Sequence, residues 1–189
     1  MGMVGWIILA VAVVAALWGV AIYNRLVKLR ALVKEGFSGI TVQLRRRADL
    51  VPNLVSTVEG YATHERETLN EVIAHRGDAV NARGVADTAQ ADNAFSAMLG
   101  RLLAVAEAYP DLKADDNFRQ LQEELSEIED HLQSARRYYN ATVRDLNTRV
   151  QSFPDVLLAR PMGFSEEEFY ADDVTTLQAA PQVKFGAKA

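Results

Sequence analysis

A long apolar run occupies the N-terminal end of the chain. Residues 4–22 read VGWIILAVAVVAALWGVAI and contain neither a charged side chain nor a proline. As a helix this run would extend roughly 28 Å, at about 1.5 Å per residue, which is close to the hydrocarbon thickness of a bilayer. Trp6 near one end and Tyr23 after the other carry rings that favour the membrane–water interface. The pattern predicts a transmembrane anchor over residues 1–23.

A cleaved signal peptide is the alternative interpretation of this run. Such peptides have a basic N-terminal region, an apolar stretch of about 7–15 residues and a small-residue cleavage site. Here no basic side chain precedes the run, and Arg25, Lys28, Arg30 and Lys34 follow it. The order of charges favours an uncleaved, single-pass anchor. By the positive-inside rule it also predicts that the N-terminus lies outside and the C-terminal domain in the cytoplasm.

After the anchor, apolar residues recur three or four positions apart, which is the spacing of one helix face. The first series predicts that the anchor helix continues to about residue 48. Asp49 and Pro52 then predict a break, because proline suits the first turn of a new helix. A turn containing Gly84 separates the second helix from a third, which ends at Tyr109-Pro110. The three apolar series are Leu26, Leu29, Val33, Phe37, Ile40 and Leu44, then Leu54, Val58, Tyr61, Leu69, Val72 and Val80, then Phe95, Leu99, Leu102 and Ala106.

The most regular pattern predicts a fourth helix, with a seam close to a heptad repeat. Asp115 or Asp116 can cap its start, and Phe153-Pro154 ends it. Because short connections favour antiparallel neighbours, the predicted fold is all-α. An N-terminal transmembrane helix continues into an elongated antiparallel bundle of about four long helices, over residues 24–154. The seam consists of Phe118, Leu121, Leu125, Ile128, Leu132, Ala135, Tyr139, Val143, Leu146 and Val150.

The remaining residues, 155–189, differ in composition and are predicted to form a partly flexible C-terminal tail. From Arg160 onward they contain two prolines and an acidic–aromatic stretch, FSEEEFYADD, over residues 164–173. Two interpretations stay open. The stretch is a flexible terminus, or it is a docking segment whose aromatic side chains bind the bundle or a partner.

Composition narrows the chemistry that the chain can perform. The net charge of -5 argues against a nucleic-acid binder, and the absence of cysteine excludes disulfides and thiolate metal sites. His64 and His75 lie about 16 Å apart on one predicted helix, too far to share a metal, and His131 stands elsewhere. Dinucleotide-binding, P-loop and nucleophile-elbow motifs are missing. We therefore predict no enzyme activity and no catalytic, cofactor-binding or metal-binding residue, and the sequence identifies no small-molecule substrate.

The basic cluster Arg45-Arg46-Arg47 also has two interpretations. It is a solvated helix end, or it contacts anionic lipid headgroups, where each charge contributes about 1 kcal/mol. If the helix runs straight from Ile22, Arg45 lies roughly 34 Å beyond the bilayer edge, which is well past a Debye length. That distance favours the solvated helix end.

Several stretches of the chain resemble the LemA family of bacterial membrane proteins. They are YNRLVKL from Tyr23, QLRRRADLVPNLVSTVEGYATHE from Gln43, AYPDLKADDNFRQLQEEL from Ala108, ARRYYNATVRDLNTRVQSFP from Ala135, and Gly163-Phe164 with Phe169-Tyr170. One departure is Gly36-Phe37-Ser-Gly39, whose two glycines predict a bend in the helix. The resemblance covers residues 4–170 and implies an anchored helical bundle in the bacterial inner membrane. It brings no active-site residues, because no catalytic activity is established for the family as a whole.

The predicted function is that of a membrane-anchored scaffold that associates with further copies of itself. The family resemblance favours this role, since a magnetosome membrane-organising protein belongs to the same family. In the anchor, Ala12 with Ala16 and Ala15 with Gly19 form small-xxx-small pairs, which allow close helix approach in lipid. The alternative is an adaptor or regulator of another membrane protein, such as an envelope-stress protein or protease. The expected partners are the lipid bilayer, further copies of the chain and a membrane protein, and not nucleic acid.

Overall fold

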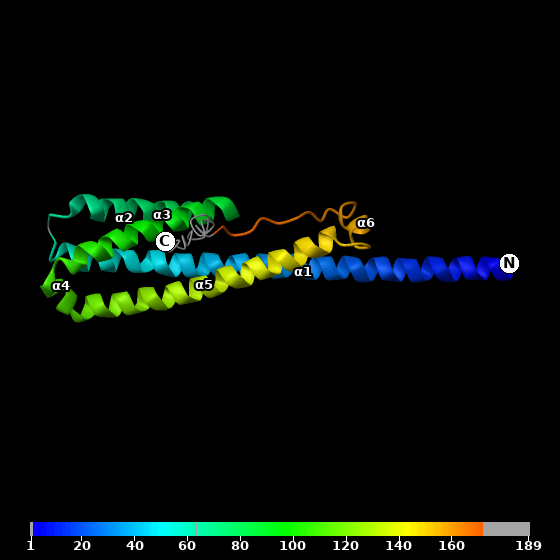
Figure 1. Ribbon diagram of the computed structural model, residues 1–189, viewed down its shortest axis with the longest axis horizontal. Helices are drawn as coiled ribbons and strands as arrows, with labels where there is room; N and C mark the ends of the chain where they lie inside the picture. The colour runs from blue at the N-terminus through cyan, green and yellow to red at the C-terminus, as the bar shows by residue number, and fades with distance from the viewer. Residues whose placement is uncertain (1, 63, 172–189) are drawn as a thin grey trace, which may run out of the picture.

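The chain folds into helices joined by short connections. A computed structural model describes residues 2–62 and 64–171, and these residues contain six helices and no strand. Figure 1 shows them as an elongated bundle with one bare helical end. The predicted all-α fold is confirmed. The helices are α1 (Met3–Glu59), α2 (Arg66–Asn81), α3 (Val85–Glu107), α4 (Pro110–Ala114), α5 (Asp116–Gln151) and α6 (Val156–Ala159).

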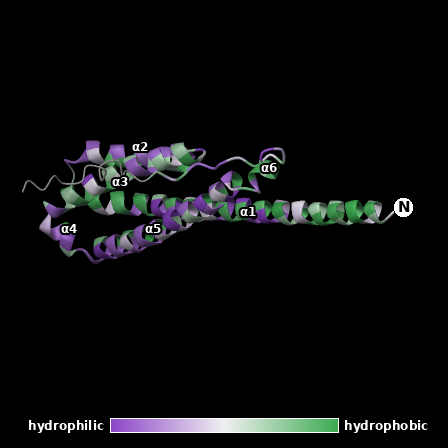
Figure 2. Cartoon of the chain, turned by 45° about the vertical axis from the view of Figure 1, so that its right-hand side comes forward, coloured by the Kyte–Doolittle hydropathy of each residue, from purple (hydrophilic) through white to green (hydrophobic). Residues whose placement is uncertain are grey.

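Helix α1 runs through the whole molecule as its spine. The long helix α5 lies beside it, and α2 and α3 cover its C-terminal half (Figure 1). The N-terminal part of α1 projects beyond the bundle, and Figure 2 shows that this bare part is mostly hydrophobic. It is long and apolar enough to cross a membrane, and only 6% of its most apolar 18-residue window is buried. The other described residues therefore leave this surface uncovered.

The predicted break at Asp49 and Pro52 is wrong, because α1 continues to Glu59 with Pro52 inside it. The proline ring is tolerated on the exposed side, while Val51 and Leu54 face the core. A turn instead follows the end of α1, at residues 60 and 61. Leu54 and Val58 consequently belong to α1, and the second helix begins at Arg66.

Apolar side chains form two core clusters, one at each end of the bundle. The cluster far from the bare helix joins α1, α2, α3 and the start of α5, around Phe95 and Phe118. The other joins α1 to the second half of α5, around Leu26 and Tyr139. The predicted α5 seam is buried except for Ile128 and Ala135, which are half-buried. The Asp115 side chain caps α5 by accepting from the Phe118 N–H at 2.9 Å.

Gly36 has a packing role and causes no break. Helix α1 continues through Gly36 and Gly39, and Figure 1 shows it straight there, so the expected bend is not observed. A Cβ added at Gly36 would lie 3.1 Å from Tyr139 Cα on α5. The missing side chain therefore lets the two long helices approach closely.

Candidate functional site

An extended segment follows α6 and lies along α5. Residues 164–170, here called the strap, contain neither helix nor strand, and Figure 1 shows them in orange, leading back along the bundle from α6. Phe164 and Tyr170, at the two ends of the strap, are buried, whereas Phe169 is exposed. Of the two interpretations that the sequence leaves open, the strap shows docking onto the bundle. The end of the acidic–aromatic stretch, Asp172 and Asp173, lies outside the described residues.

Two asparagines on α5 hold the strap by its backbone. Asn147 donates its Nδ2–H to the Glu167 carbonyl at 2.9 Å and accepts from the Glu167 N–H at 2.8 Å. Asn140 forms the same pair with Tyr170, at 3.1 and 2.9 Å. A carboxamide carries the donor and the acceptor of a peptide group. Each asparagine therefore satisfies a strap residue as a neighbouring β-strand would.

The spacing of these contacts matches the geometry of a helix beside an extended chain. Asn140 and Asn147 are seven residues apart, which is about 10.5 Å along a helix. The two strap residues that they bind are three apart, which is about 10 Å along an extended chain. Between them, the Tyr139 hydroxyl donates to the Glu168 carbonyl at 2.7 Å. The two asparagine contacts thus place the strap antiparallel to α5, and the Tyr139 hydroxyl adds a third contact at the strap residue Glu168.

The last strap residue reaches a carboxylate in the middle of the bundle. The Tyr170 hydroxyl donates to Asp92 Oδ2 on α3 at 2.8 Å, and its ring lies 5.6 Å from the Arg136 guanidinium. Asp92 is fully buried. Burial raises the pKa of Tyr170 far above its usual range, and the Asp92 carboxylate raises that pKa further. The hydroxyl therefore stays a proton donor at any ordinary pH.

Asp92 is the centre of a charge cluster that joins three helices. Arg47 of α1 lies 3.3 Å from Asp92 Oδ1 and donates to Ser96 Oγ at 2.9 Å, while Arg136 of α5 bonds Asp92 Oδ2. Glu129 lies 3.4 Å from Arg47 and 3.8 Å from Arg136. Burial lowers the pKa of Arg47, and the carboxylates of Glu129 and Asp92 oppose this change. Two cations and two anions balance, as a buried charged group requires.

The first strap residue is held by α1, close to the bare part of that helix. Arg30 donates to the Gly163 carbonyl at 2.6 Å, and its guanidinium lies 4.4 Å from the centre of the Phe164 ring. The Tyr23 ring meets the same phenylalanine edge-on, at 5.8 Å between ring centres. At each end of the strap, an arginine of the bundle therefore contacts the ring of the buried aromatic residue.

The arrangement is suited to holding a segment in place. The hydroxyls and guanidiniums described above donate to a carboxylate, a carbonyl or another hydroxyl, and each of these bonds fixes the position of its two partners. The described residues contain no group of three histidine, aspartate or glutamate side chains placed to bind a metal. The site can thus bind an extended peptide by its backbone and select it by the aromatic side chains at its two ends.

Comparison with known proteins identifies the family. The sequence profile of the LemA family matches residues 36–185. The chain belongs to the LemA family. The matched range contains the charge cluster and the whole strap. The bare part of α1 and the helical turns that follow it precede the match.

Characterised relatives of this LemA-family chain include magnetosome proteins. It is 26% identical to magnetosome protein MamQ 2 of Paramagnetospirillum magneticum over 176 aligned positions, covering 79% of this chain and 65% of the relative. The values for MamQ of Magnetospirillum gryphiswaldense are 26%, 78% and 64%. Protein LemA of Metamycoplasma hominis is also 26% identical, with 69% and 60% covered. The chain therefore spans just under two thirds of the length of these relatives. Its family and the apolar end of α1 indicate a membrane-associated protein.

The interpretation of Arg45-Arg46-Arg47 requires a correction for one residue of this LemA-family chain. Arg45 and Arg46 are exposed, but Arg47 is only 7% exposed and pairs with Asp92. The cluster is not a helix end, because α1 continues beyond it. Of the three histidines, His64 is exposed in the turn before α2, His75 lies 3.7 Å from Asp78, and His131 lies 3.6 Å from Glu127.

Sequence reasoning missed the residues that make the LemA-family strap site. Asp92 and Arg136 occupy positions on otherwise apolar helix faces, Asp92 three residues before Phe95 and Arg136 four residues after Leu132. A charged residue inside an apolar stripe was the available signal. Asn140 and Asn147 give a weaker sequence signal, since a seven-residue interval places them on one face of α5.

Proposed function

We propose that this LemA-family protein is a single-pass inner-membrane scaffold that carries a strapped helical bundle and associates with further copies of itself. The observation that carries the proposal is the continuity of α1. One helix of 57 residues contains both the bare apolar end and the spine of the bundle. Without a hinge between the two parts, the orientation of the membrane span also sets the orientation of the bundle.

The exposed apolar surface of α1 supports the membrane span. Side chains such as Trp6, Ile8, Val14 and Leu17 are between half and two thirds exposed. An apolar surface of this length is stable only when something apolar covers it, and a helix of about 20 residues fits a bilayer. Removal as a signal peptide fits poorly, because α1 continues unbroken through the apolar run into the bundle core, where Ile22 and Leu26 are buried.

The proposed orientation places the bundle in the cytoplasm and the N-terminus outside. Arg25, Lys28, Arg30 and Lys34 all follow the apolar run, and cytoplasmic flanks carry such an excess of basic residues. Arg30 is bonded to the chain beside the strap, at the Gly163 carbonyl. Arg25 and Lys28 are exposed and remain available to contact the membrane surface.

Self-association is supported by the small residues of the bare helix and by the rod-like shape of the bundle. Ala12 and Ala16, which are both exposed, leave room for a second helix in lipid, whereas Leu158 of α6 already packs against Gly19. Contacts between bundles held side by side on one membrane add to such weak helix pairing through a high effective concentration. Relatives named as magnetosome proteins agree with a role on a membrane.

Light scattering of the full chain in detergent and in nanodiscs tests the scaffold. We expect a discrete homo-oligomer, which Ala12→Leu with Ala16→Leu dissociates, while Val13→Leu with Val14→Leu leaves it intact. A monomer at every lipid-to-protein ratio would end the scaffold proposal. Orientation is tested separately with single cysteines at Gly2 and Asp78 in intact cells, where only the first should react with an impermeant reagent.

The adaptor function is the second candidate, and a surface cleft favours it. The cleft between α3 and α5 is lined by Leu99, Leu103 and Leu125, together with Arg47 and Glu129. A cleft whose lining combines leucines with charged side chains suits a segment of another protein. A chain that is monomeric in the membrane but copurifies with one membrane protein, and loses it on Leu103→Asp, would favour this function.

A further inference from the structure

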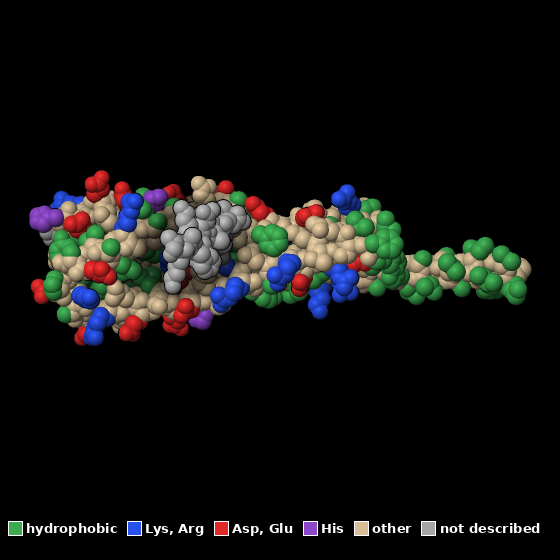
Figure 3. All heavy atoms as spheres, viewed as in Figure 1, with side chains coloured by type: hydrophobic (Ala, Val, Ile, Leu, Met, Phe, Trp, Pro, Cys, Tyr) green, Lys and Arg blue, Asp and Glu red, His purple; other side chains and the backbone are tan. Residues whose placement is uncertain are grey.

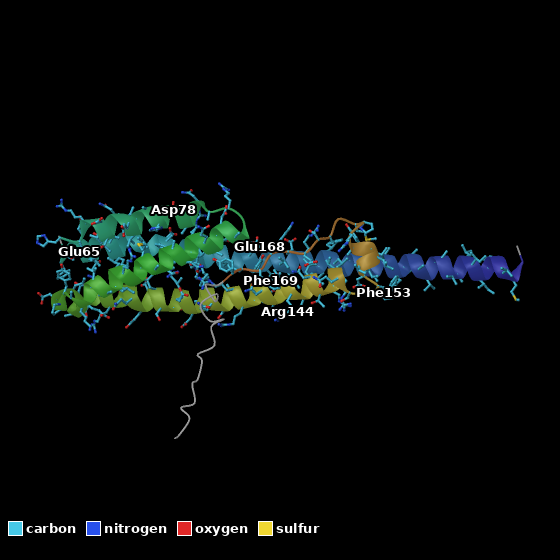
Figure 4. The ribbon with its side chains drawn as sticks, turned by 45° about the horizontal axis from the view of Figure 1, so that its top comes forward. Glu65, Asp78, Arg144, Phe153, Glu168 and Phe169 are labelled. Carbon is cyan, nitrogen blue, oxygen red and sulfur yellow. The ribbon has the colours of Figure 1, made fainter. Side chains whose placement is uncertain are left out.

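The corner between α5 and α6 exposes large apolar side chains. Phe153 is 80% exposed and Leu157 is 62% exposed, and Met162, shortly after α6, is partly exposed. Figure 4 labels Phe153 at the end of the bundle nearest the bare part of α1, and Glu65 at the opposite end. We call Phe153, Leu157 and Met162 the foot. A monomeric protein in water gains nothing by exposing such residues together, so their common position needs an explanation.

The foot lies level with the end of the apolar run. A Cβ added at Gly19 would meet Leu158 Cδ1 of α6 at 3.8 Å, so α6 packs directly against that turn of α1. Gly19 is three residues inside the end of the run at Ile22, which is about 4.5 Å along a helix. If the run fills the hydrocarbon layer, α6 reaches the boundary between headgroups and acyl chains. The foot is then a continuation of the surface that α1 presents to lipid.

Charged side chains around the foot have the arrangement of a membrane interface. Figure 3 shows hydrophobic side chains gathered where the bundle meets the bare helix, with Lys and Arg side chains directly behind them. Arg25, Lys28 and Arg160 are exposed in this region. Asp155, between Phe153 and Leu157, is buried and pairs with Arg149 at 3.3 Å, whereas Glu166, which lines a pocket with Arg160, is exposed. Apolar groups toward the bilayer and basic groups at headgroup level are typical of interfacial helices.

We propose that the foot inserts into the interfacial layer of the same bilayer that α1 spans. The inference rests on the proposed membrane span. The occupant of the foot is lipid, because the foot adjoins the bare helix at the level of the interface and is backed by cations that match anionic headgroups. The bundle is then held to the membrane at two points, by α1 and by the foot, and it cannot tilt away from the side of the foot without withdrawing the foot from the interface.

The absence of cysteine from the chain allows a direct test by spin labelling. Single cysteines replace Phe153, Leu157, Val13 and Asp78 in the full chain, which is labelled and reconstituted in nanodiscs containing anionic lipid. Collision of each label with oxygen, which concentrates in lipid, is compared with collision with a water-soluble nickel chelate. Asp78 is the matched control, because its side chain is 72% exposed and belongs to α2. Val13 reports the span itself.

We expect labels at 153 and 157 to collide severalfold less with the nickel chelate than the label at 78, and more with oxygen. If label 13 lies in lipid while labels 153 and 157 lie in water, the foot is wrong and the span survives. If label 13 also lies in water, both proposals fail. Low collision with both reagents, together with dipolar broadening that disappears on dilution with unlabelled chain, would mean that a second copy covers the foot and would also overturn the inference.

A second measurement covers the case in which a labelled variant does not fold. Phe153→Trp is a conservative change, and Trp6→Phe with Trp18→Phe removes the other tryptophans. Lipids brominated near the headgroup should then quench most of the fluorescence of the single tryptophan introduced by Phe153→Trp. The further change Leu157→Ser should reduce that quenching severalfold, whereas Asp78→Ser should not. Fluorescence that only aqueous iodide quenches would refute lipid contact.

Discussion

The Arg76 guanidinium donates its Nε–H to the Ala48 carbonyl at 2.7 Å, and this bond connects α2 to the spine of the molecule. Ala48 lies four residues before Pro52, which has no N–H to complete the helical hydrogen bond. A side chain from another helix thus supplies the donor that the proline lacks. This replacement explains how α1 can pass through a proline where the sequence predicts a break.

Arg76→Met should therefore cost about 1–3 kcal/mol of unfolding free energy, because it leaves the Ala48 carbonyl buried without a donor. Arg83→Met, at an exposed position just after α2, should stay within about 0.5 kcal/mol. Pro52→Ala restores a backbone N–H, and in that background the cost of Arg76→Met should fall to the level of the control. Denaturant titration of the full chain in detergent, for the natural sequence, each single variant and the double variant, measures these costs. Equal costs in both backgrounds would show that the bond does not compensate for the proline.

The contact between Arg76 and Ala48 also shows what the sequence can and cannot predict of the fold. Periodicity identified α3 and α5 and most of their buried residues, because large apolar residues at helical spacing, such as Phe95, Leu102 and Leu132, are buried whichever partner covers them. It failed at Pro52, since the compensating donor is 24 residues away in sequence, on a different helix. Local rules describe what a residue prefers alone, and here a tertiary contact reverses the preference.

The site was harder to predict than the fold for a related reason. Phe164 and Tyr170 stood out as a possible docking segment, but nothing local identifies Asp92 or Asn147 as their receptors. Buried polar groups of this kind are stable only when all their partners are assembled, so their burial is a property of the whole cluster. Arg47 shows the same limitation, because its neighbours Arg45 and Arg46 have the solvated surroundings that the sequence suggests for all three.

Loss of one asparagine should release the strap before it unfolds the bundle. Asn147→Ala removes two hydrogen bonds to Glu167, which together contribute about 1–3 kcal/mol. Amide exchange of residues 165–170 should accelerate by roughly 5- to 150-fold, a ratio that corresponds to that free energy. Gln151→Ala, at an exposed position on the same helix, should leave exchange unchanged. Hydrogen–deuterium exchange by mass spectrometry resolves the two regions, and equal acceleration in strap and core would contradict a separately anchored strap.

Asp92→Asn should be among the most destabilising single changes. It leaves the guanidiniums of Arg47 and Arg136 in a buried site with half of their counter-charge removed, which typically costs about 3–5 kcal/mol. Tyr170→Phe removes one bond to the same carboxylate and should cost about 1.5–3 kcal/mol. Because both changes act on one cluster, the double variant should cost less than the sum. Asp130→Asn on the exposed face of α5 is the control, and strict additivity in the cycle would argue that the two residues act independently.

High pH should destabilise the protein through its buried tyrosines. Burial, with Glu167 and Glu168 nearby, raises the pKa of Tyr139 to about 12, and the pKa of Tyr170 is also raised. An unfolded chain releases these protons near pH 10, so the contribution is complete below that pH and is lost as pH rises from about 10 toward 12. Thermal melts across that range should show a falling Tm. The variant with Tyr139→Phe and Tyr170→Phe should start lower at neutral pH but fall less steeply, and parallel slopes would assign the alkaline loss to other groups.

Two glycines of α1 provide a matched comparison of helix preference and helix packing. At both positions alanine should favour the helix by about 1 kcal/mol when nothing opposes it. A Cβ at Gly39 would meet only Ala135 Cβ at 3.9 Å, which is an ordinary contact, so Gly39→Ala should raise the denaturation midpoint. A Cβ at Gly36 would lie 3.1 Å from Tyr139 Cα, and that backbone atom can move away only if α1 and α5 separate. Gly36→Ala should thus lose the gain, and Gly36→Leu should cost at least about 1–3 kcal/mol through overpacking. Equal stabilisation by alanine at both positions would show that the two helices have room to spare at Gly36.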